Sequence, residues 1–544
     1  MEMIQAVKKM EKEAIKGSGI DFIRLGFALF FMVAVLTYSF LSTGGIPNNV
    51  FLAIAALFGA YMAMNIGAND VANNVGPAVG SKALTMGGAI VIAAIFEAAG
   101  AFIAGGDVVS TIKNGIIDVN SFGTDINAFI WAMMAALLAA AVWLNLATYF
   151  KAPVSTTHSI VGGVMGAGIA AGGFGVVAWG TMGGIVASWV ISPLLGAIVA
   201  ALFLYTIKKT MVYKDDKMAA AKIWVPIFVA IMTWAFVTYL TLKGVTNIWP
   251  SIVETFSFLP DEKKPSFGIA AILGLIFAVV IYVLVRKTVA ARAENLENNR
   301  DSINMLFTVP LIFAAALLSF AHGANDVANA IGPLAAINDA VMTGEISSKA
   351  GIPLWVMAVG AFGIVIGLAL YGPTLIRSVG SEITELDQMR AFSVAMAAAI
   401  TVIIASQLGL PVSSTHIAIG GIFGVGFLRE YLTSTGQEEI IQTEKVILDD
   451  EKRVLKSLNS ELKSLESKAD KEKSDYERIV ELYKMIDVEE DKIKVAKKIL
   501  KSAEKVQYVK RDAVKRIIAA WLITVPTAAG IAALIFFVIR GISL

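Results

Sequence analysis

Eleven long apolar runs restrict how this chain can fold more than any other feature. They lie at residues 22–42, 51–68, 87–105, 126–150, 176–206, 222–243, 267–286, 304–322, 351–372, 390–409 and 514–540. A helix needs about 20 apolar residues to cross the hydrocarbon core of a bilayer. Charged residues make up 16% of the chain, whereas about 25% of residues are charged in a soluble domain. The sequence therefore predicts an all-α polytopic membrane protein embedded in a lipid bilayer.

One segment, residues 437–512, departs from this composition. It holds 18 Lys and Arg and 19 Asp and Glu residues, which are 37 of the 88 in the chain. Leucines recur in it at three- and four-residue steps, at Leu455, Leu458, Leu462 and Leu465, a pattern typical of an amphipathic helix. We expect a soluble, coiled-coil-like helical insert. A structural role is the simpler interpretation, and a regulatory or partner-binding role is the alternative.

Composition also argues against several classes of protein. The chain has no cysteine, which excludes disulfides, thiolate catalysis and cysteine-ligated metals. Its net charge of +2 gives no reason to expect a nucleic-acid partner. The sequence has no Gly-rich loop of the nucleotide-binding type, and the run Ser155–His158 lacks a third group to orient a nucleophile, so we expect no enzyme. The basic N-terminus has no A-x-A-like cleavage site, so we interpret residues 22–42 as a spanning helix rather than a signal peptide.

The most specific feature is a motif that occurs twice. Residues 67–77 read GANDVANNVGP and residues 323–333 read GANDVANAIGP. A second motif is also duplicated, because residues 152–158 read APVSTTH and residues 410–416 read LPVSSTH. The offsets between copies are 256 and 258 residues. A weaker match, at a larger offset, sets residues 109–112 (VSTI) against residues 376–379 (IRSV). The same order in both halves predicts an internal repeat.

Charge predicts that the two repeats have opposite orientations in the membrane. The loops at 207–222 and 286–303 are rich in Lys and Arg, and the positive-inside rule places both in the cytoplasm. With a cytoplasmic N-terminus, run 51–68 then enters from outside and run 304–322 from inside. Inverted repeats are an architecture of secondary transporters, in which substrate and coupling ions bind near the bilayer midplane.

These patterns predict the divisions of the chain. We expect an N-terminal segment with the first spanning helix (1–50), membrane repeat 1 (51–206), connecting helices and loops (207–303), membrane repeat 2 (304–436), the insert (437–512) and a final helix that completes repeat 2 (513–544). The segments near 153–172 and 411–428 are too short to span, and we interpret them as re-entrant half-helices, which are tolerated where backbone lines a cavity.

The Asn-Asp motif has the chemistry of a cation site. On a helix, Asn69, Asp70 and Asn73 share one face, as do Asn325, Asp326 and Asn329. Carboxylate and amide oxygens are hard ligands, and the flanking Gly and Pro residues favour helix breaks that expose further carbonyls. A carboxylate inside a membrane helix is costly, so two copies favour a site. Interhelical hydrogen bonding is the structural alternative.

The second motif has the chemistry of an oxyanion site. Proline favours the first turn of a helix, and the hydroxyls that follow lie near free backbone N–H groups at the positive end of the helix dipole. These hydroxyls belong to Ser155, Thr156, Thr157, Ser413, Ser414 and Thr415. N-capping alone is the structural alternative.

A further group of polar residues is predicted to surround the site. Glu97 lies within an apolar run, and we expect it beside Asp70. All three histidines, His158, His322 and His416, lie in or next to the motifs and are candidates for a structural, proton-carrying or substrate role. Glu382 and Gln407 complete this group.

The four motif copies resemble the signatures of the inorganic phosphate transporter (PiT) family. The resemblance covers about 51–205 and 304–428 plus the final helix, and it implies symport of phosphate with sodium ions or protons. It implies that Asn69, Asp70, Asn325 and Asp326 bind ions and phosphate. By the same resemblance, the six hydroxyls bind phosphate, together with Ser110, Thr111 and Ser378 from the weaker match. The insert near the C-terminus departs from the family pattern, as do Gln407 and Leu408 before Gly409.

The resemblance implies a phosphate symporter, and with the motif chemistry we expect a sodium/phosphate symporter that works by alternating access. Both aspartates would repel phosphate until cations neutralise them, which makes binding of the two solutes mutually dependent. Neutral amide oxygens favour sodium as the coupling ion, and we expect no other cofactor. The alternatives are proton coupling, a sulfate permease of the same fold, and an uncoupled anion channel. We expect a homodimer in the cytoplasmic membrane, with residues 437–512 in the cytoplasm.

Overall fold

The fold was analysed in a computed structural model. It describes the backbone of all residues except 1, 124, 151–153, 247, 257–258, 261, 263, 347–350, 383–385, 505–507 and 544. Side chains are described for the same residues apart from 2–20, 114, 378–382, 434–444, 501–504, 513 and 516.

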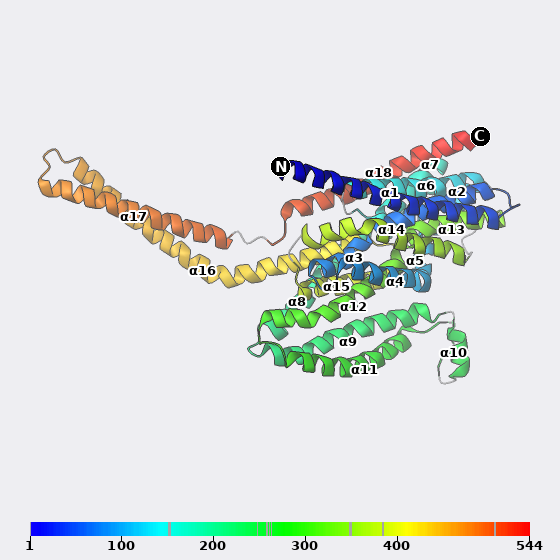
Figure 1. The fold of residues 1–544 in the computed structure, drawn as a ribbon, viewed down its shortest axis with the longest axis horizontal. Helices are drawn as coiled ribbons and strands as arrows, with labels where there is room; N and C mark the ends of the chain where they lie inside the picture. Colours follow the sequence, from blue (N-terminus) through cyan, green and yellow to red (C-terminus); the bar gives the residue numbers. More distant parts are fainter. Residues whose placement is uncertain are drawn as a thin grey trace. The chain divides into compact units, whose positions relative to one another are not determined.

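Helices account for the architecture of the described residues, and these residues contain no strand (Figure 1). The α-helices are α1 (Glu2–Ser42), α2 (Asn49–Asn69), α3 (Val71–Gly80), α4 (Met86–Ala104), α5 (Gly106–Asn114), α6 (Ile126–Tyr149), α7 (Thr156–Gly172), α8 (Trp179–Ile207), α9 (Lys217–Gly244), α10 (Trp249–Thr255), α11 (Phe267–Ala293), α12 (Arg300–Asp326), α13 (Ala328–Thr343), α14 (Leu354–Glu382), α15 (Gln388–Gln407), α16 (Ser414–Glu466), α17 (Lys473–Glu504) and α18 (Arg511–Ser543).

Eleven segments of the described chain are long and apolar enough to cross a membrane. Each of them overlaps one of the apolar runs predicted from sequence, and the all-α polytopic class is confirmed. Two of these segments, Asn49–Gly80 and Arg300–Thr343, each comprise two helices. Both contain an Asn-Asp motif at the junction between the two helices. The inverted orientation of the repeats remains a prediction.

Glycines allow the motif helices to pack closely against their neighbours. A side chain at Gly67 in α2 would overlap the backbone carbonyl of Ile364 in α14, and one at Gly323 in α12 would overlap that of Glu97 in α4. Small residues at such crossings are typical of membrane helices, where close van der Waals packing drives association. The fold therefore holds both motifs on tightly packed helices.

The two predicted half-helices have different lengths. Helix α7 ends at Gly172, close to the predicted end of its segment. Helix α16 begins at Ser414 but continues to Glu466, so the expectation of a short helix over 411–428 is wrong at its C-terminal end. The physical reason is that no proline occurs between Pro411 and Pro526, and nothing else in the sequence stops the helix near residue 428.

The chain divides into two compact units, Met1–Val425 with Arg511–Leu544, and Gly426–Lys510. The second unit overlaps the predicted insert but begins earlier, because α16 runs on without a break. Within this unit, Leu448 of α16 packs with Ile493 and Ala496 of α17. Leu458 and Leu462 pack with Leu482. Leucines at helical spacing thus form the inner face of a helical hairpin.

Candidate functional site

The two Asn-Asp motifs occupy short interruptions between consecutive helices. The first interruption is at Asp70, between α2 and α3, and the second is at Val327, between α12 and α13. Both residues keep right-handed helical dihedral angles, so each break is a local tightening of the chain. The interruptions therefore lie within the Asn-Asp motifs and span one residue each. Breaks at the flanking residues are absent, because Pro77 and Pro333 lie inside α3 and α13. The expectation that the flanking Gly and Pro residues break the helices is wrong.

The aspartates of the two copies come together inside the protein. One carboxylate oxygen each of Asp70 and Asp326 and one ring nitrogen of His322 lie within 4.8 Å of one another. All three side chains are buried. Two carboxylates at that separation repel by about 3–4 kcal/mol at an effective dielectric constant of 20. The arrangement therefore favours a positive charge or a proton between them.

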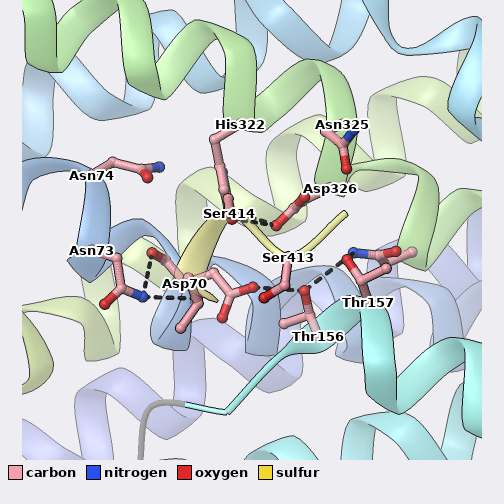
Figure 2. Close-up of polar contacts among 12 residues, drawn as sticks. Asp70, Asn73, Asn74, Thr156, Thr157, His322, Asn325, Asp326, Ser413 and Ser414 are labelled. Atoms are coloured by element: carbon pink, nitrogen blue, oxygen red, sulfur yellow. Dashed lines mark hydrogen bonds and ion pairs between the residues drawn. The ribbon is translucent and has the colours of Figure 1, made fainter. Parts of the chain in front are cut away.

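Hydroxyls at the starts of α7 and α16 contact these carboxylates. Thr156 Oγ1 donates to Asp70 Oδ2 at 2.6 Å, and Ser414 Oγ donates to Asp326 Oδ2 at 2.9 Å. Figure 2 shows both contacts, with Ser413 lying between the two groups. Each motif copy is thus bound to the helix start that follows it in sequence.

The second asparagine of each motif reaches the other helix start. Asn73 Nδ2 donates to Thr415 Oγ1 at 2.8 Å. Asn329 Nδ2 donates to Thr156 Oγ1 and Thr157 Oγ1, both at 3.1 Å. These crossed contacts join both motif copies and both helix N-termini into one polar cluster.

Several oxygens in this cluster accept no hydrogen bond from the described residues. They are Asp70 Oδ1, Asp326 Oδ1 and the amide oxygens of Asn73, Asn325 and Asn329. A buried acceptor without a donor costs about 1–3 kcal/mol, and five such atoms in one place call for a ligand. Carboxylate and amide oxygens suit hard cations. The donor set therefore fits a hard cation.

Ser155 and Ser413 serve as N-caps. Ser155 Oγ accepts the backbone N–H of His158 at 3.1 Å, and Ser413 Oγ accepts that of His416 at 3.2 Å. The capping interpretation is therefore correct for these two oxygens. Neither hydroxyl donates to another described residue, so both hydrogens are available to an anion at the helix N-termini.

Glu97 lies in a different place from the one expected. Its Oε2 is 2.6 Å from His322 Nδ1, and its Oε1 accepts from Asn74 Nδ2 at 2.9 Å. His322 Nε2 lies 2.9 Å from Asp326 Oδ2. Glu97 thus lies behind Asp326, through His322, and the expectation that it lies beside Asp70 is corrected. Sequence alone could not show which helix packs against α4.

His158 and His416 lie in an aromatic cluster. Their rings meet edge to face, with ring centroids 4.4 Å apart. The His158 ring is tilted against Trp189 at 3.9 Å, and the His416 ring stacks on Trp521 at 3.7 Å. Their ring nitrogens have no hydrogen-bond partner among the described residues. Both rings are buried three residues after the capping serines, so the geometry favours a packing role for them.

Other predicted residues lie elsewhere. Ser110 is exposed and Gln407 is exposed, so the structure does not bring either into the cluster. Thr111 Oγ1 donates to the carbonyl of Gly409 at 2.7 Å and supports the loop before α16. The side chains of Ser378 and Glu382 lie outside the described residues.

Two hydrogen bonds of the cluster were not predicted from the sequence. Asn69 Nδ2 donates to Thr148 Oγ1, and Asn325 Nδ2 donates to Ser406 Oγ, both at 2.9 Å. Thr148 and Ser406 stand 258 residues apart, the same offset as the second motif. Hydroxyl residues at equivalent repeat positions were the signal that could have identified them.

Comparison with known proteins identifies the family of the chain. Residues 66–532 match the phosphate transporter family. A protein of Helicobacter pylori (strain J99) named "Putative phosphate permease" is 48% identical over 98% of both chains. A protein of Pyrococcus furiosus with the same kind of name is 40% identical over 70% of this chain and 87% of its own.

One solved structure is also similar. It is named "The sodium-dependent phosphate transporter", and it is 29% identical with a TM-score of 0.69. The match covers 90% of this chain and 99% of that chain. The similarity therefore extends over nearly the whole of the solved structure.

Proposed function

Because this chain belongs to the phosphate transporter family, we propose that it carries inorganic phosphate together with sodium ions across the cytoplasmic membrane. It is a multi-pass membrane transporter and not an enzyme. Phosphate is the solute of its family. The proposal concerns the coupling ion, the order of binding and the alternating-access cycle.

The observation that carries the proposal is the convergence of Asp70 and Asp326 beside the starts of α7 and α16. Helix N-termini attract an oxyanion, but two carboxylates beside them repel it. Cations between the carboxylates and the anion remove the conflict. Each solute then raises the affinity for the other by the same factor, and this is the thermodynamic basis of symport.

Phosphate would bind at the two helix N-termini. The hydroxyls of Ser155 and Ser413 have hydrogens to donate, and the backbone N–H groups of the first turns add further donors. Thr157 lies at the same helix start, but its Oγ1 donates to the carbonyl of Val412 at 2.9 Å, so its hydrogen is already used. Such donors bind an oxyanion without a fixed positive charge.

Sodium is favoured over protons by the unpaired oxygens. An amide oxygen coordinates a metal ion readily, whereas binding of a proton requires a more basic group. Three of the five acceptors without a donor are amide oxygens, on Asn73, Asn325 and Asn329. The name of the similar solved structure, a sodium-dependent transporter, supports the same choice.

Transport in proteoliposomes tests the proposal. Labelled phosphate uptake is measured with an inward sodium gradient, with an inward proton gradient, and with neither. We expect uptake to follow the sodium gradient alone. Uptake that follows only the proton gradient would replace sodium by protons, and uptake without any cation gradient would indicate a channel. Strong competition by sulfate would reject phosphate as the preferred anion.

A further inference from the structure

The helical hairpin of α16 and α17 has a second apolar surface besides the one that joins its two helices (Figure 1). Leu448 and Leu458 of α16 belong to the surface that packs on α17. The other surface consists of five apolar residues with exposed fractions of 40–58%, which are Ile447, Val454, Met485, Val488 and Val495. We call these five residues the exposed stripe. Such a surface on a soluble hairpin marks an interaction site.

On α16, the exposed stripe lies beside the core positions of a heptad repeat. Leu448 and Leu455 stand seven residues apart and belong to one cluster with α17, so both occupy position a. Ile447 and Val454 each precede one of these leucines and therefore occupy position g. A helix with apolar residues at a, d and g contacts more than one neighbour in a bundle, whereas a and d alone are enough for a two-helix contact.

Helix α17 shows the same pattern. Ile486 and Ile493 stand seven residues apart and pack in the hairpin core, so both occupy position a. Met485 precedes Ile486 and occupies position g. Val488 and Val495 occupy position c, which adjoins g on the surface of a helix. Both helices therefore carry apolar side chains outside their contact with each other.

Contacts across the hairpin show that the apolar positions of the two helices lie on the same side. Arg478 Nε of α17 lies 2.9 Å from Glu461 Oε1 of α16, and both residues occupy g positions. Tyr483 donates its hydroxyl to Glu466 Oε1 at 2.8 Å, and both of these residues occupy e positions. The g positions thus share one side of the hairpin, which carries the exposed stripe, and the e positions share the other.

The charges of the hairpin favour a second copy of it as the partner. The unit Gly426–Lys510 holds 18 Lys and Arg against 19 Asp and Glu, a net charge of −1, whereas segments that bind an anionic membrane surface are strongly basic. Lys492, which shares position g with Met485, pairs with Glu489 at 3.0 Å and with Glu451 at 3.9 Å. Two such surfaces therefore meet without like-charge repulsion.

We propose that the exposed stripe joins two copies of this chain, whose hairpins pair into a four-helix bundle. The stripe runs over both helices, so α16 of each copy can lie on α17 of the other, as a two-fold contact requires. Both copies are held in one membrane, which raises their effective concentration and makes a short contact sufficient. The proposal concerns the hairpin alone and does not depend on which solutes the membrane unit carries.

Cross-linking of single cysteines in the full-length protein tests the proposal. The chain has no cysteine, so Val495→Cys places one thiol on the exposed stripe, and Lys497→Cys places one at an exposed e position of the same helix. Both variants are reconstituted at the same protein-to-lipid ratio and treated with a short bismaleimide. We expect dimers to form at least about tenfold faster with Val495→Cys, because thiols held close together react at a high effective concentration.

A charge added to the stripe shows whether the stripe itself makes the contact. Adding Val454→Glu to the Val495→Cys protein should slow cross-linking about tenfold, because a charge buried in the contact loses its water. Asn459→Glu adds the same charge at an exposed e position of α16 and should leave the rate unchanged. Size-exclusion chromatography checks that each protein is folded and monodisperse.

Three results would overturn the inference. They are equal cross-linking rates for the two cysteines, a Val495→Cys rate that Val454→Glu does not slow, and protection of Val495→Cys from a water-soluble maleimide in vesicles that hold one protein molecule each. The last result would mean that the membrane or another part of the same chain covers the stripe. All of these readouts are independent of phosphate uptake, so a failure of the proposed function would leave them unchanged.

Discussion

At the scale of single residues, Asp70 and Asp326 bear the charge on which coupling depends. Both are buried, and each has one carboxylate oxygen without a donor among the described residues. The hydroxyls of Thr156 and Ser414 donate to the other oxygen of Asp70 and of Asp326, respectively, and hold it in place. The carboxylates therefore have a fixed orientation toward the space between them, where a cation would lower their mutual repulsion.

Asp70→Asn and Asp326→Asn should each reduce sodium-driven phosphate uptake at least a hundredfold, because an amide cannot neutralise a cation in a buried site. Asp301→Asn is the matched control, since Asp301 is exposed in the first turn of the same helix, α12. Uptake is measured in proteoliposomes with equal amounts of folded protein. Near-normal sodium-dependent uptake in both site variants would remove these residues from the cation sites.

Ser413→Ala should raise the phosphate KM about tenfold and leave the sodium constants unchanged. The hydroxyl caps α16 through the N–H of His416, and its hydrogen is proposed to bind phosphate, a contact worth about 1.5–3 kcal/mol. Ser413→Thr keeps the hydroxyl and should restore the KM. A variant that lost stability without a change in KM would show that Ser413 is only a cap.

At the scale of secondary-structure elements, the close helix crossings place the motifs. Gly67 of α2 and Gly323 of α12 each face a backbone carbonyl of another helix. Any larger residue must push the helices apart, and overpacking in a close-packed interior costs about 1–3 kcal/mol or more.

Gly67→Ala and Gly323→Ala should therefore lower the melting temperature of the purified protein by several degrees. Gly183→Ala is the control, because Gly183 lies in the membrane helix α8 with open space where its Cβ would be. Thermal unfolding in detergent compares the three variants. Equal melting temperatures would mean that these crossings are not tight.

The sequence predicted the positions of the helices better than it predicted which helices pack together. The apolar runs identified the spanning helices, and the duplicated motif indicated that Asp70 and Asp326 share a site. No periodicity shows which helix packs on which, so the contact of Glu97 with His322 could not be foreseen. The length of α16 was not predicted. The charge of the sequence rises near residue 437, but this rise marks a different environment for the helix and does not end the helix.

At the scale of the whole molecule, the chain combines a membrane unit with a helical unit at Gly426–Lys510. The polar cluster of the candidate site belongs entirely to the first unit. The second unit has its own apolar contacts between α16 and α17. Transport is therefore expected to depend on the first unit alone.

Replacing residues 437–510 by a glycine–serine linker should leave sodium-dependent phosphate uptake within about twofold of the wild type per folded molecule, since a flexible linker imposes little constraint on the ends it joins. Size-exclusion chromatography and proteoliposome uptake check folding and activity. Loss of uptake in a well-folded, monodisperse variant would assign the second unit a role in the transport cycle.

The central claim is that phosphate and sodium bind and move together. In its most direct test, the phosphate gradient drives sodium instead of the sodium gradient driving phosphate. Proteoliposomes receive an inward phosphate gradient with equal sodium on both sides, and entry of labelled sodium is measured. Coupling is reciprocal, so sodium should accumulate against its own gradient in the wild type and not in Asp70→Asn. Phosphate entry with no accompanying sodium would contradict the account.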